Sequence, residues 1–273
     1  MIEIDQLGVS LSGRFILSGI SCIARAGQVT AIIGPNGSGK STLLKALCRD
    51  HAYSGTVRLN GRDLARLSPV EAACQRAVLP QSSTLPFPFT VREVVTMGLR
   101  AGRPGPEGAA LVALPEQALA LVDLPDFGGR SYGELSGGEQ QRVQLARVLC
   151  QVWQPVLEDT PRYLFLDEPV SSLDVKHQLM IMRAARAYAD AGGGVLAVLH
   201  DLNLAAMFAD AVLALAEGNL LASGSPADVL TDANISAIFD APLRVGVTPP
   251  GGAPFVLPQS AAKASLSPQT KVA

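Results

Sequence analysis

The sequence predicts an α/β fold in which an antiparallel N-terminal β-subdomain precedes a mixed core sheet that carries a helical insertion. The β-branched apolar run Val29–Ile33 leads through a glycine-rich loop into a helix, which is typical of a strand buried on both faces. Strand patterns at Tyr163–Leu166 and Gly194–Leu199 flank a helical stretch near Val175–Asp190, a spacing typical of parallel strands joined by a crossover. Helix-forming residues dominate from about residue 90 to residue 153, so we place the insertion there.

The N-terminal elements read as short strands separated by turns. Ile2–Ile4, Gly8–Leu11 and Ile20–Ala24 have strand patterns, and turn residues stand between them. A helix is expected from Lys40 to about Cys48, and a further strand at Thr56–Leu59.

Three capping boxes mark the expected starts of later helices. In each box a serine or threonine stands three residues before a Glu or Asp, so that each side chain can bond the backbone of the other residue. The boxes run from Ser68 to Glu71, from Thr90 to Glu93 and from Ser225 to Asp228. Ala211–Leu215 and Leu220–Ala222, joined by a turn that contains glycine, predict a hairpin.

The composition excludes several classes of protein. Hydrophobic residues make up 48% of the 273 residues and charged residues 17%, whereas soluble domains carry roughly 25% charged residues. The net charge of −2 argues against a protein whose main task is to grip nucleic acid. The acidic N-terminus does not resemble a signal peptide, and no apolar run reaches the length of a membrane span. We therefore expect the chain to stay in the cytoplasm.

The chain divides into one domain and a tail. We assign residues 1–246 to the domain, including the insertion at about 90–153, and residues 247–273 to a C-terminal extension rich in Pro, Gly, Ser and Lys. The last part of this extension carries almost no large apolar side chains, so we expect it to be mobile.

The strongest functional signal is the glycine-rich loop between the Val29–Ile33 strand and the helix after it. Its glycines let successive N–H groups point at an anion, and the helix N-terminus adds partial positive charge. Lys40 would be a cation for the β- and γ-phosphates, and the Ser41 hydroxyl would ligate Mg²⁺. A turn without a ligand is the alternative, which the strand–loop–helix context disfavours. The predicted phosphate site comprises Gly34, Pro35, Asn36, Gly37, Ser38, Gly39, Lys40, Ser41 and Thr42.

Two acids close the strand Tyr163–Leu166. Asp167 and Glu168 follow it directly, at the end of a strand where open α/β sheets bind ligands. Asp167 would reach Mg²⁺ directly or through water, and Glu168 would accept a proton from the water that attacks the γ-phosphate. Taken alone, the pair is equally consistent with an ordinary polar loop.

A third motif opens the helix that follows Leu135. Ser136 to Glu139 is a capping box, and Gly137 and Gly138 would let an anion approach the helix N-terminus closely. As a single string it predicts only a capped helix. Its position between the phosphate loop and the acidic strand makes it informative.

Together these motifs resemble the nucleotide-binding subunits of ATP-binding-cassette (ABC) transporters. GPNGSGKST is similar to the Walker A motif, LSGGEQ to the family signature and YLFLDEP to the Walker B motif, and they follow the family's order within about residues 2–240. Gln81 matches the Q-loop glutamine, Asp174 ends the D-loop segment SSLD, and His200 matches the switch histidine. The resemblance implies a P-loop NTPase fold of the ABC type.

The resemblance also implies an ATPase that works as a head-to-tail homodimer. Each ATP would lie between the Walker A loop of one copy and the signature of the other. Glu168 and His200 would be catalytic, and the Mg²⁺ shell would include Ser41, Gln81 and Asp167. The nucleotide contacts outside the phosphate loop would come from Gln81, Ser136, Gly137, Gly138, Gln140 and Asp174. Leu11 stands where the family often has an aromatic residue against adenine, which implies aliphatic packing and weak base selectivity.

A closer similarity concerns the cargo. Residues 77–83, 87–95, 135–149 and 196–206 resemble the ATP-binding subunits of haemin importers. Importers of ferric siderophores and of cobalamin share much of this pattern and stay open as alternatives. The resemblance implies two transmembrane permease subunits, an indirect link to a periplasmic or surface substrate-binding protein, and no nucleic acid. It implies a peripheral position on the cytoplasmic side of the bacterial inner membrane.

Alternatives from other classes stay open. One is a soluble ABC-type assembly or regulatory ATPase, and another is a nucleic-acid-linked ABC ATPase, which the balanced charge disfavours. The apolar loop Leu85–Phe89, where prolines flank Phe87, predicts part of a groove for a cytoplasmic helix of a permease. Simple packing of the insertion is the other explanation of this loop.

Overall fold

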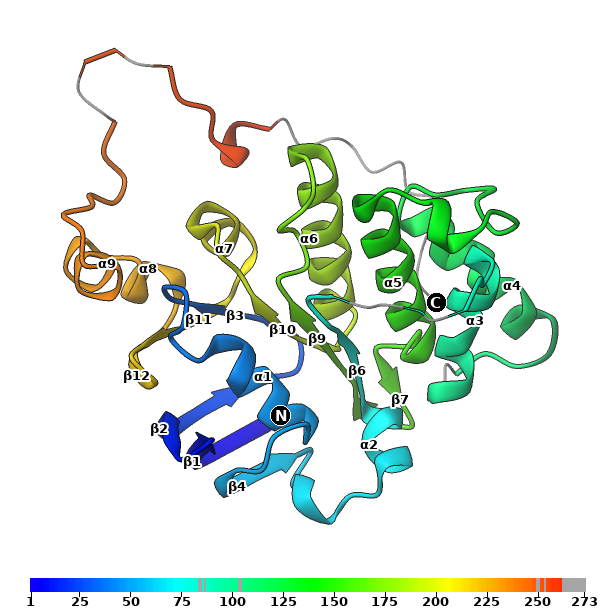
Figure 1. Ribbon diagram of the computed structural model, residues 1–273, viewed down its shortest axis with the longest axis horizontal. Coiled ribbons are helices and arrows are strands. Elements are labelled where there is room, and N and C mark those ends of the chain that lie inside the picture. The colour runs from blue at the N-terminus through cyan, green and yellow to red at the C-terminus, as the bar shows by residue number, and fades with distance from the viewer. Residues whose placement is uncertain (83–84, 86, 103–104, 249–250, 253, 262–273) are drawn as a thin grey trace.

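The computed structural model describes residues 1–82, 85, 87–102, 105–248, 251–252 and 254–261. Figure 1 shows a small N-terminal sheet below a larger core sheet, with a group of helices at the right that forms the insertion. The fold class predicted from the sequence is confirmed.

The N-terminal sheet is antiparallel and has the strand order β2-β1-β4-β5. Where two short strands were expected at Ile2–Ile4 and Gly8–Leu11, the chain forms one strand, so that expectation was wrong. Gln6 adopts a left-handed φ of 51° inside this strand, and the register to β2 shifts there. A bulge thus allows one continuous strand to include residues whose sequence pattern is typical of a turn. The strands are β1 (Ile2–Leu11), β2 (Arg14–Ala24), β4 (Ser54–Leu59) and β5 (Arg62–Asp63).

The core sheet has the strand order β12-β11-β3-β10-β9-β6. All neighbouring pairs are parallel except β11 and β12, which form the predicted antiparallel hairpin. Val198 is in register with both Ile32 and Asp167, so the carboxyl ends of three central strands meet at one edge. The strands are β3 (Val29–Ile33), β6 (Arg76–Leu79), β9 (Tyr163–Asp167), β10 (Gly194–Val198), β11 (Ala211–Ala216) and β12 (Asn219–Gly224).

The core sheet separates two hydrophobic clusters. Ile32 and Phe165 pack toward the N-terminal sheet, whereas their neighbours Ala31, Ile33 and Leu164 pack toward the other face. Side chains alternate along a strand, so each of these strands is buried on both faces. This double burial explains their continuous apolar sequences.

Helices cover both faces of the core sheet and begin where the capping signals predict. Ser68, Thr90, Ser136 and Ser225 each form a complete capping box. Outside the insertion the helices are α1 (Lys40–Cys48), α2 (Pro69–Gln75), α6 (Val175–Asp190), α7 (Leu202–Phe208), α8 (Pro226–Val229) and α9 (Asp232–Phe239). A short hairpin of β7 (Val156–Leu157) and β8 (Thr160–Pro161) precedes β9, and 3₁₀ turns lie at Leu64–Arg66, Tyr132–Glu134 and Pro258–Ser260.

The insertion consists of α3 (Val91–Ala101), α4 (Gly108–Leu121) and α5 (Gly137–Gln151). Helices α3 and α5 pack very closely, because a Cβ built on Gly98 would lie 2.0 Å from the carbonyl oxygen of Arg147. Figure 1 shows these helices to one side of the strands, next to β6. In this view α5 lies apart from α1.

The last described segment, from about residue 243 to 261, is largely exposed. Gln259 donates to the side chain of Asn203 at the start of α7, at 3.2 Å. The expected mobility of the chain end concerns residues 262–273, which lie outside the described residues, and the division at residue 246 stays a prediction. None of the helices in the described ranges has the length and apolar character that crossing a bilayer requires.

Candidate nucleotide site at the carboxyl edge of the core sheet

The phosphate loop joins β3 to α1 in a conformation that requires glycine. Gly34 has a φ of 146°, and a Cβ there would lie 2.1 Å from the carbonyl oxygen of Leu215 in β11. Gly39 caps α1 with a φ of 100° and packs against Leu17 of the N-terminal sheet. Pro35, Asn36, Gly37 and Ser38 form the turn between them, and Thr42 lies in the first turn of α1. The loop is thus wedged between the two sheets.

Lys40 is buried and bridges the loop. Its Nζ donates to the carbonyl oxygens of Gly34 at 2.9 Å and of Pro35 at 2.8 Å. Burial lowers the pKa of Lys40, and the nearby carboxylates of Glu168 and Asp167 act against that shift. The ammonium is therefore held under the loop, where it would face an anion bound above it.

Ser38 shows that the loop has unused hydrogen-bonding capacity. Its hydroxyl oxygen is buried, and among the described residues it has no hydrogen-bond partner. A buried hydroxyl without a partner costs free energy, and a ligand oxygen would satisfy it. The hydrogen-bonding groups of the loop thus fit a phosphate group.

Ser41 and Asp167 meet at the end of the loop. The Ser41 hydroxyl donates to Asp167 Oδ1 at 2.9 Å, although the two residues are 126 positions apart. Asp167 is buried at the end of β9, and its burial raises its pKa while the bond from Ser41 lowers it. A hydroxyl and a carboxylate in contact are oxygen ligands of the kind that Mg²⁺ prefers.

Glu168 lies at the centre of a second cluster. Gln81 Nε2 donates to Glu168 Oε2 at 2.9 Å, and His200 Nε2 lies 2.7 Å from Glu168 Oε1. The Glu168 side chain is only 14% exposed. A cavity lined by Glu168, Ser171 and His200 opens beside it. The structure thus brings together three of the predicted site residues, which lie in the segments that follow β9, β6 and β10.

The backbone of Glu168 is also constrained. It has a left-handed φ of 51°, a conformation that most residues avoid. Gln141 of α5 donates to its carbonyl oxygen at 3.1 Å, and Ser171 Oγ donates to the same atom at 3.2 Å. Gln141 also accepts from Ser172 Oγ at 2.6 Å. Gln141, which lies two residues beyond the capping-box glutamate, was not predicted from the sequence as a site residue.

The signature residues lie apart from the phosphate loop of the same chain. In Figure 1 the core strands separate α5 from α1. Ser136 and Gly137 are exposed, and the Ser136 hydroxyl donates to Glu139 Oε2 at 2.7 Å in the capping box. Gln140 donates to the carbonyl oxygen of Leu135 at 3.1 Å. A Cβ on Gly138 would lie 3.0 Å from Leu173, so the signature abuts the D-loop.

Two further predicted residues lie outside both clusters. Asp174 caps α6, and its Oδ1 accepts from the backbone of His177 at 2.9 Å. Leu11 is partly buried against the core on the side of the N-terminal sheet. Phe15, which was not predicted from the sequence as a site residue, is 83% exposed at the start of β2. It offers an aromatic surface on the same hairpin as Leu11.

Comparison with known proteins identifies the family. A family model described as "ABC transporter" matches residues 17–171. The chain belongs to the ABC transporter family. It is therefore an ATP-binding subunit, and the family's activity is ATP hydrolysis coupled to transport.

Individual relatives are similar over nearly the whole chain. The chain is 60% identical to "Hemin import ATP-binding protein HmuV" of Mesorhizobium japonicum, covering 95% of this chain and 99% of the relative. It is 58% identical to the protein of the same name from Chelativorans sp., covering 96% and 99%. A solved structure described as "Structure of ATP binding subunit of ABC transporter" matches with a TM-score of 0.74 at 23% identity, covering 84% of this chain and 91% of that one, and supports the fold.

Proposed function

We propose that this chain is the ATPase subunit of a haemin importer. The convergence of Lys40, Asp167 and Glu168 at one edge of the sheet supports ATP hydrolysis. The single observation that carries the cargo assignment is the near full-length similarity to proteins named for hemin import. The chain would lie against the cytoplasmic side of the inner membrane by binding two permease subunits.

The proposed active form is a head-to-tail homodimer. The N-terminus of α5 is exposed and carries Ser136 and Gly137, yet it lies apart from the phosphate loop of its own chain. A helix N-terminus with free N–H groups favours anions. A second copy, turned head to tail, would bring this helix end to the phosphates from the opposite side. Asp174 would approach the same interface as part of the D-loop.

Mg²⁺ is proposed to lie beside Ser41, Gln81 and Asp167. When bound, the ion would offset the negative charge of the β- and γ-phosphates. Asp167 and Ser41 already contact each other, and the charge of Lys40 acts against the rise in the Asp167 pKa that burial causes. These side chains supply the hydroxyl, amide and carboxylate oxygens that fit such an ion.

Glu168 is proposed to take the proton from the attacking water. Gln81 and His200 each hold one carboxylate oxygen of Glu168, so they fix its orientation. His200 is 41% exposed and faces the cavity beside Glu168, where it would also contact the γ-phosphate. General-base catalysis by a positioned carboxylate of this kind contributes about 100- to 10,000-fold to the rate.

The cargo is tested in the assembled transporter. The chain should co-purify with two permease subunits, and haemin supplied with its binding protein should raise ATP hydrolysis in lipid vesicles. Stimulation by a ferric siderophore or by cobalamin, and not by haemin, would identify the alternative cargo. Failure to associate with any membrane subunit would favour the soluble assembly or regulatory ATPase.

Phe87 is proposed to contact the permease. Its side chain is 68% exposed and stands edge-on to Phe89, with ring centroids 6.2 Å apart. Phe89 instead packs against the core, and its carbonyl oxygen accepts from Tyr132 N at 2.9 Å. The structure thus divides the loop into one surface residue and one packing residue, whereas the sequence suggested that both line a groove. Pro86 lies outside the described residues.

Replacing Phe87 by Asp should uncouple uptake from hydrolysis. We expect uptake by the assembled transporter to fall at least about tenfold, because a buried aromatic anchor at an interface is often worth about 2 kcal/mol or more. Basal ATP hydrolysis should change by less than about twofold. Val112→Asp is the matched control, since Val112 is 76% exposed on α4. Equal loss of folding and basal hydrolysis in Phe87→Asp would reject the docking role.

A further inference from the structure

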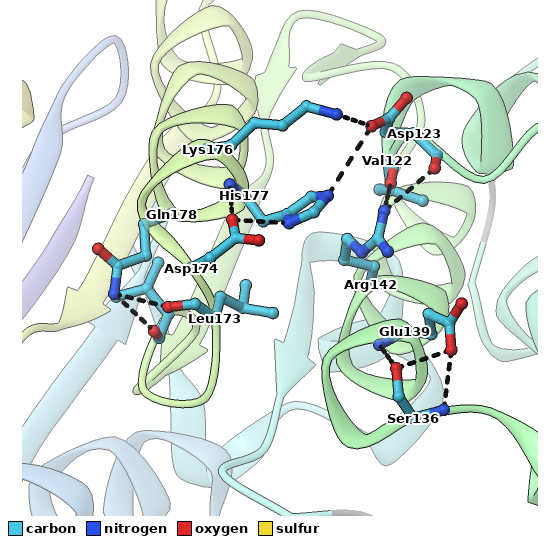
Figure 2. Close-up of polar contacts among 11 residues, drawn as sticks. Val122, Asp123, Ser136, Glu139, Arg142, Leu173, Asp174, Lys176, His177 and Gln178 are labelled. Carbon is cyan, nitrogen blue, oxygen red and sulfur yellow. Dashed lines mark hydrogen bonds and ion pairs between the residues drawn. The ribbon is translucent and has the colours of Figure 1, made fainter. Parts of the chain in front are cut away.

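A histidine bridges the start of α6 and the end of α4 (Figure 2). His177 Nδ1 lies 2.8 Å from Asp174 Oδ1, the carboxylate that caps α6. Its other ring nitrogen, Nε2, lies 3.8 Å from Asp123 Oδ2, just beyond the end of α4. The His177 side chain is only 19% exposed. The imidazole therefore lies between one carboxylate of the core and one carboxylate of the insertion.

The insertion holds the backbone of Asp123 in place. Arg142 of α5 is buried, and its Nη1 donates to the carbonyl oxygens of Val122 at 3.1 Å and of Asp123 at 3.0 Å. Figure 2 shows this guanidinium directed at the end of α4. Arg142 lies on α5, the helix that the signature residue Ser136 caps. The position of Asp123 is thus tied to the signature helix.

On the core side, the segment from Glu168 to Asp174 is short and internally bonded. Ser171 Oγ donates to the carbonyl oxygen of Glu168 at 3.2 Å, and Gln178 Nε2 donates to the carbonyl oxygens of Val170 at 3.3 Å and of Leu173 at 3.0 Å. These bonds fasten the segment to the first turn of α6. A shift at the start of α6 would therefore move the backbone of Glu168.

We propose that His177 is a positioning residue that ties the start of α6, and through it Glu168, to the helical insertion by way of Asp123. The inference rests on the proposed role of Glu168 as the base. Together with the bond from Gln141 of α5 to the Glu168 carbonyl oxygen, the tie makes the placement of Glu168 depend on the position of the signature helix. Hydrolysis would then be fast only when the insertion is correctly seated against the core.

The test is steady-state ATP hydrolysis by the full chain with Mg²⁺. In His177→Ala, kcat should fall about tenfold while KM changes by less than about twofold, because small misplacements of a catalytic group cost up to about 100-fold. His177→Asn separates the two contacts of the ring. Its amide can still donate to Asp174 near the Nδ1 position, but it is too short to reach Asp123. We expect this variant to be as slow as His177→Ala.

Asp123→Asn should lower kcat to a similar extent, and the double variant with His177→Ala should be no slower than either single one, because both remove the same tie. Lys176→Ala is the matched control. Lys176 Nζ contacts the same Asp123 carboxylate at 2.6 Å but is 72% exposed. Exposed ion pairs contribute little, so kcat should change by less than about twofold.

Wild-type kcat in His177→Asn would overturn the inference, since the ring would then serve only as part of the helix cap. Additive losses in the double variant would overturn it as well. If His177→Ala does not fold, His177→Asn and Asp123→Asn carry the test. Failure of the proposed role of Glu168 is distinguishable, because Glu168→Gln would then hydrolyse ATP at the wild-type rate, whatever the effect of His177→Asn.

Discussion

Glu168→Gln is expected to lower kcat for ATP hydrolysis by at least about 100-fold, because a positioned general base typically contributes that much or more. ATP binding should persist, since the substitution leaves Lys40, Ser41 and the loop amides in place. Gln has nearly the same shape as Glu, so Gln81 and His200 keep a partner of similar size. The measurements are single-turnover and steady-state hydrolysis together with ATP affinity by equilibrium binding.

The matched control for this substitution is Glu107→Gln. Glu107 is exposed at the start of α4 and makes no capping hydrogen bond with its side chain. Its kcat should equal that of the wild type within about twofold, because surface substitutions of this kind have small effects. Unchanged hydrolysis in Glu168→Gln would show that another group takes the proton from water.

Lys40→Ala should abolish useful ATP affinity. Lys40 is the only phosphate-directed cation that the sequence pattern provides in this loop, and its Nζ is already held between the Gly34 and Pro35 carbonyl oxygens. Hydrogen bonds to charged groups contribute about 1.5–3 kcal/mol each, so loss of two phosphate contacts should weaken binding by more than about 100-fold. Isothermal titration with MgATP measures this directly.

Lys45→Ala is the control for this second substitution. Lys45 lies on the same helix but is exposed in its last turn. We expect its ATP affinity to match the wild type within about threefold, since an exposed lysine contributes little. Equal affinity in Lys40→Ala and the wild type would remove the phosphate loop from the binding site.

The parts of the fold that depend on local signals were predictable from the sequence. Three elements have the predicted bounds, because apolar runs and capping residues are signals carried by residues close together in the sequence. These elements are Val29–Ile33, Lys40–Cys48 and Val175–Asp190. Strand β1 was misjudged because a bulge at Gln6 has the appearance of a turn. Strand β6 was missed, since four residues carry too little periodicity.

The candidate site was predictable to the extent that its residues belong to contiguous motifs. Each motif identifies candidate site residues from the sequence, but the hydrogen bonds between residues of different motifs form only in the folded chain. Gln81 and Glu168 are 87 positions apart, and nothing local indicates that they touch. The roles of Gln141 and His177 arise from packing of the insertion against the core, and single-sequence patterns do not report such packing.

The central claim is that each ATP is bound by the phosphate loop of one copy and the signature helix of another. A mixture of two defective chains tests it, both carrying Glu168→Gln to prevent turnover. One chain carries Lys40→Ala and the other Gly137→Asp. No described atom beyond the chain neighbours and the helix backbone lies within 4 Å of a Cβ on Gly137, so the chain should accept this substitution. An aspartate at a helix N-terminus suits the helix but repels phosphate.

The measurement is the ATP retained per dimer after gel filtration with Mg²⁺. Each variant alone should elute as a monomer without ATP, because every site that it can form has one defect. The mixture should form dimers that retain one ATP, since one of the two shared sites then combines an intact loop with an intact signature. If the mixture retains no more ATP than the separate variants, the site is not shared between copies and the account is contradicted.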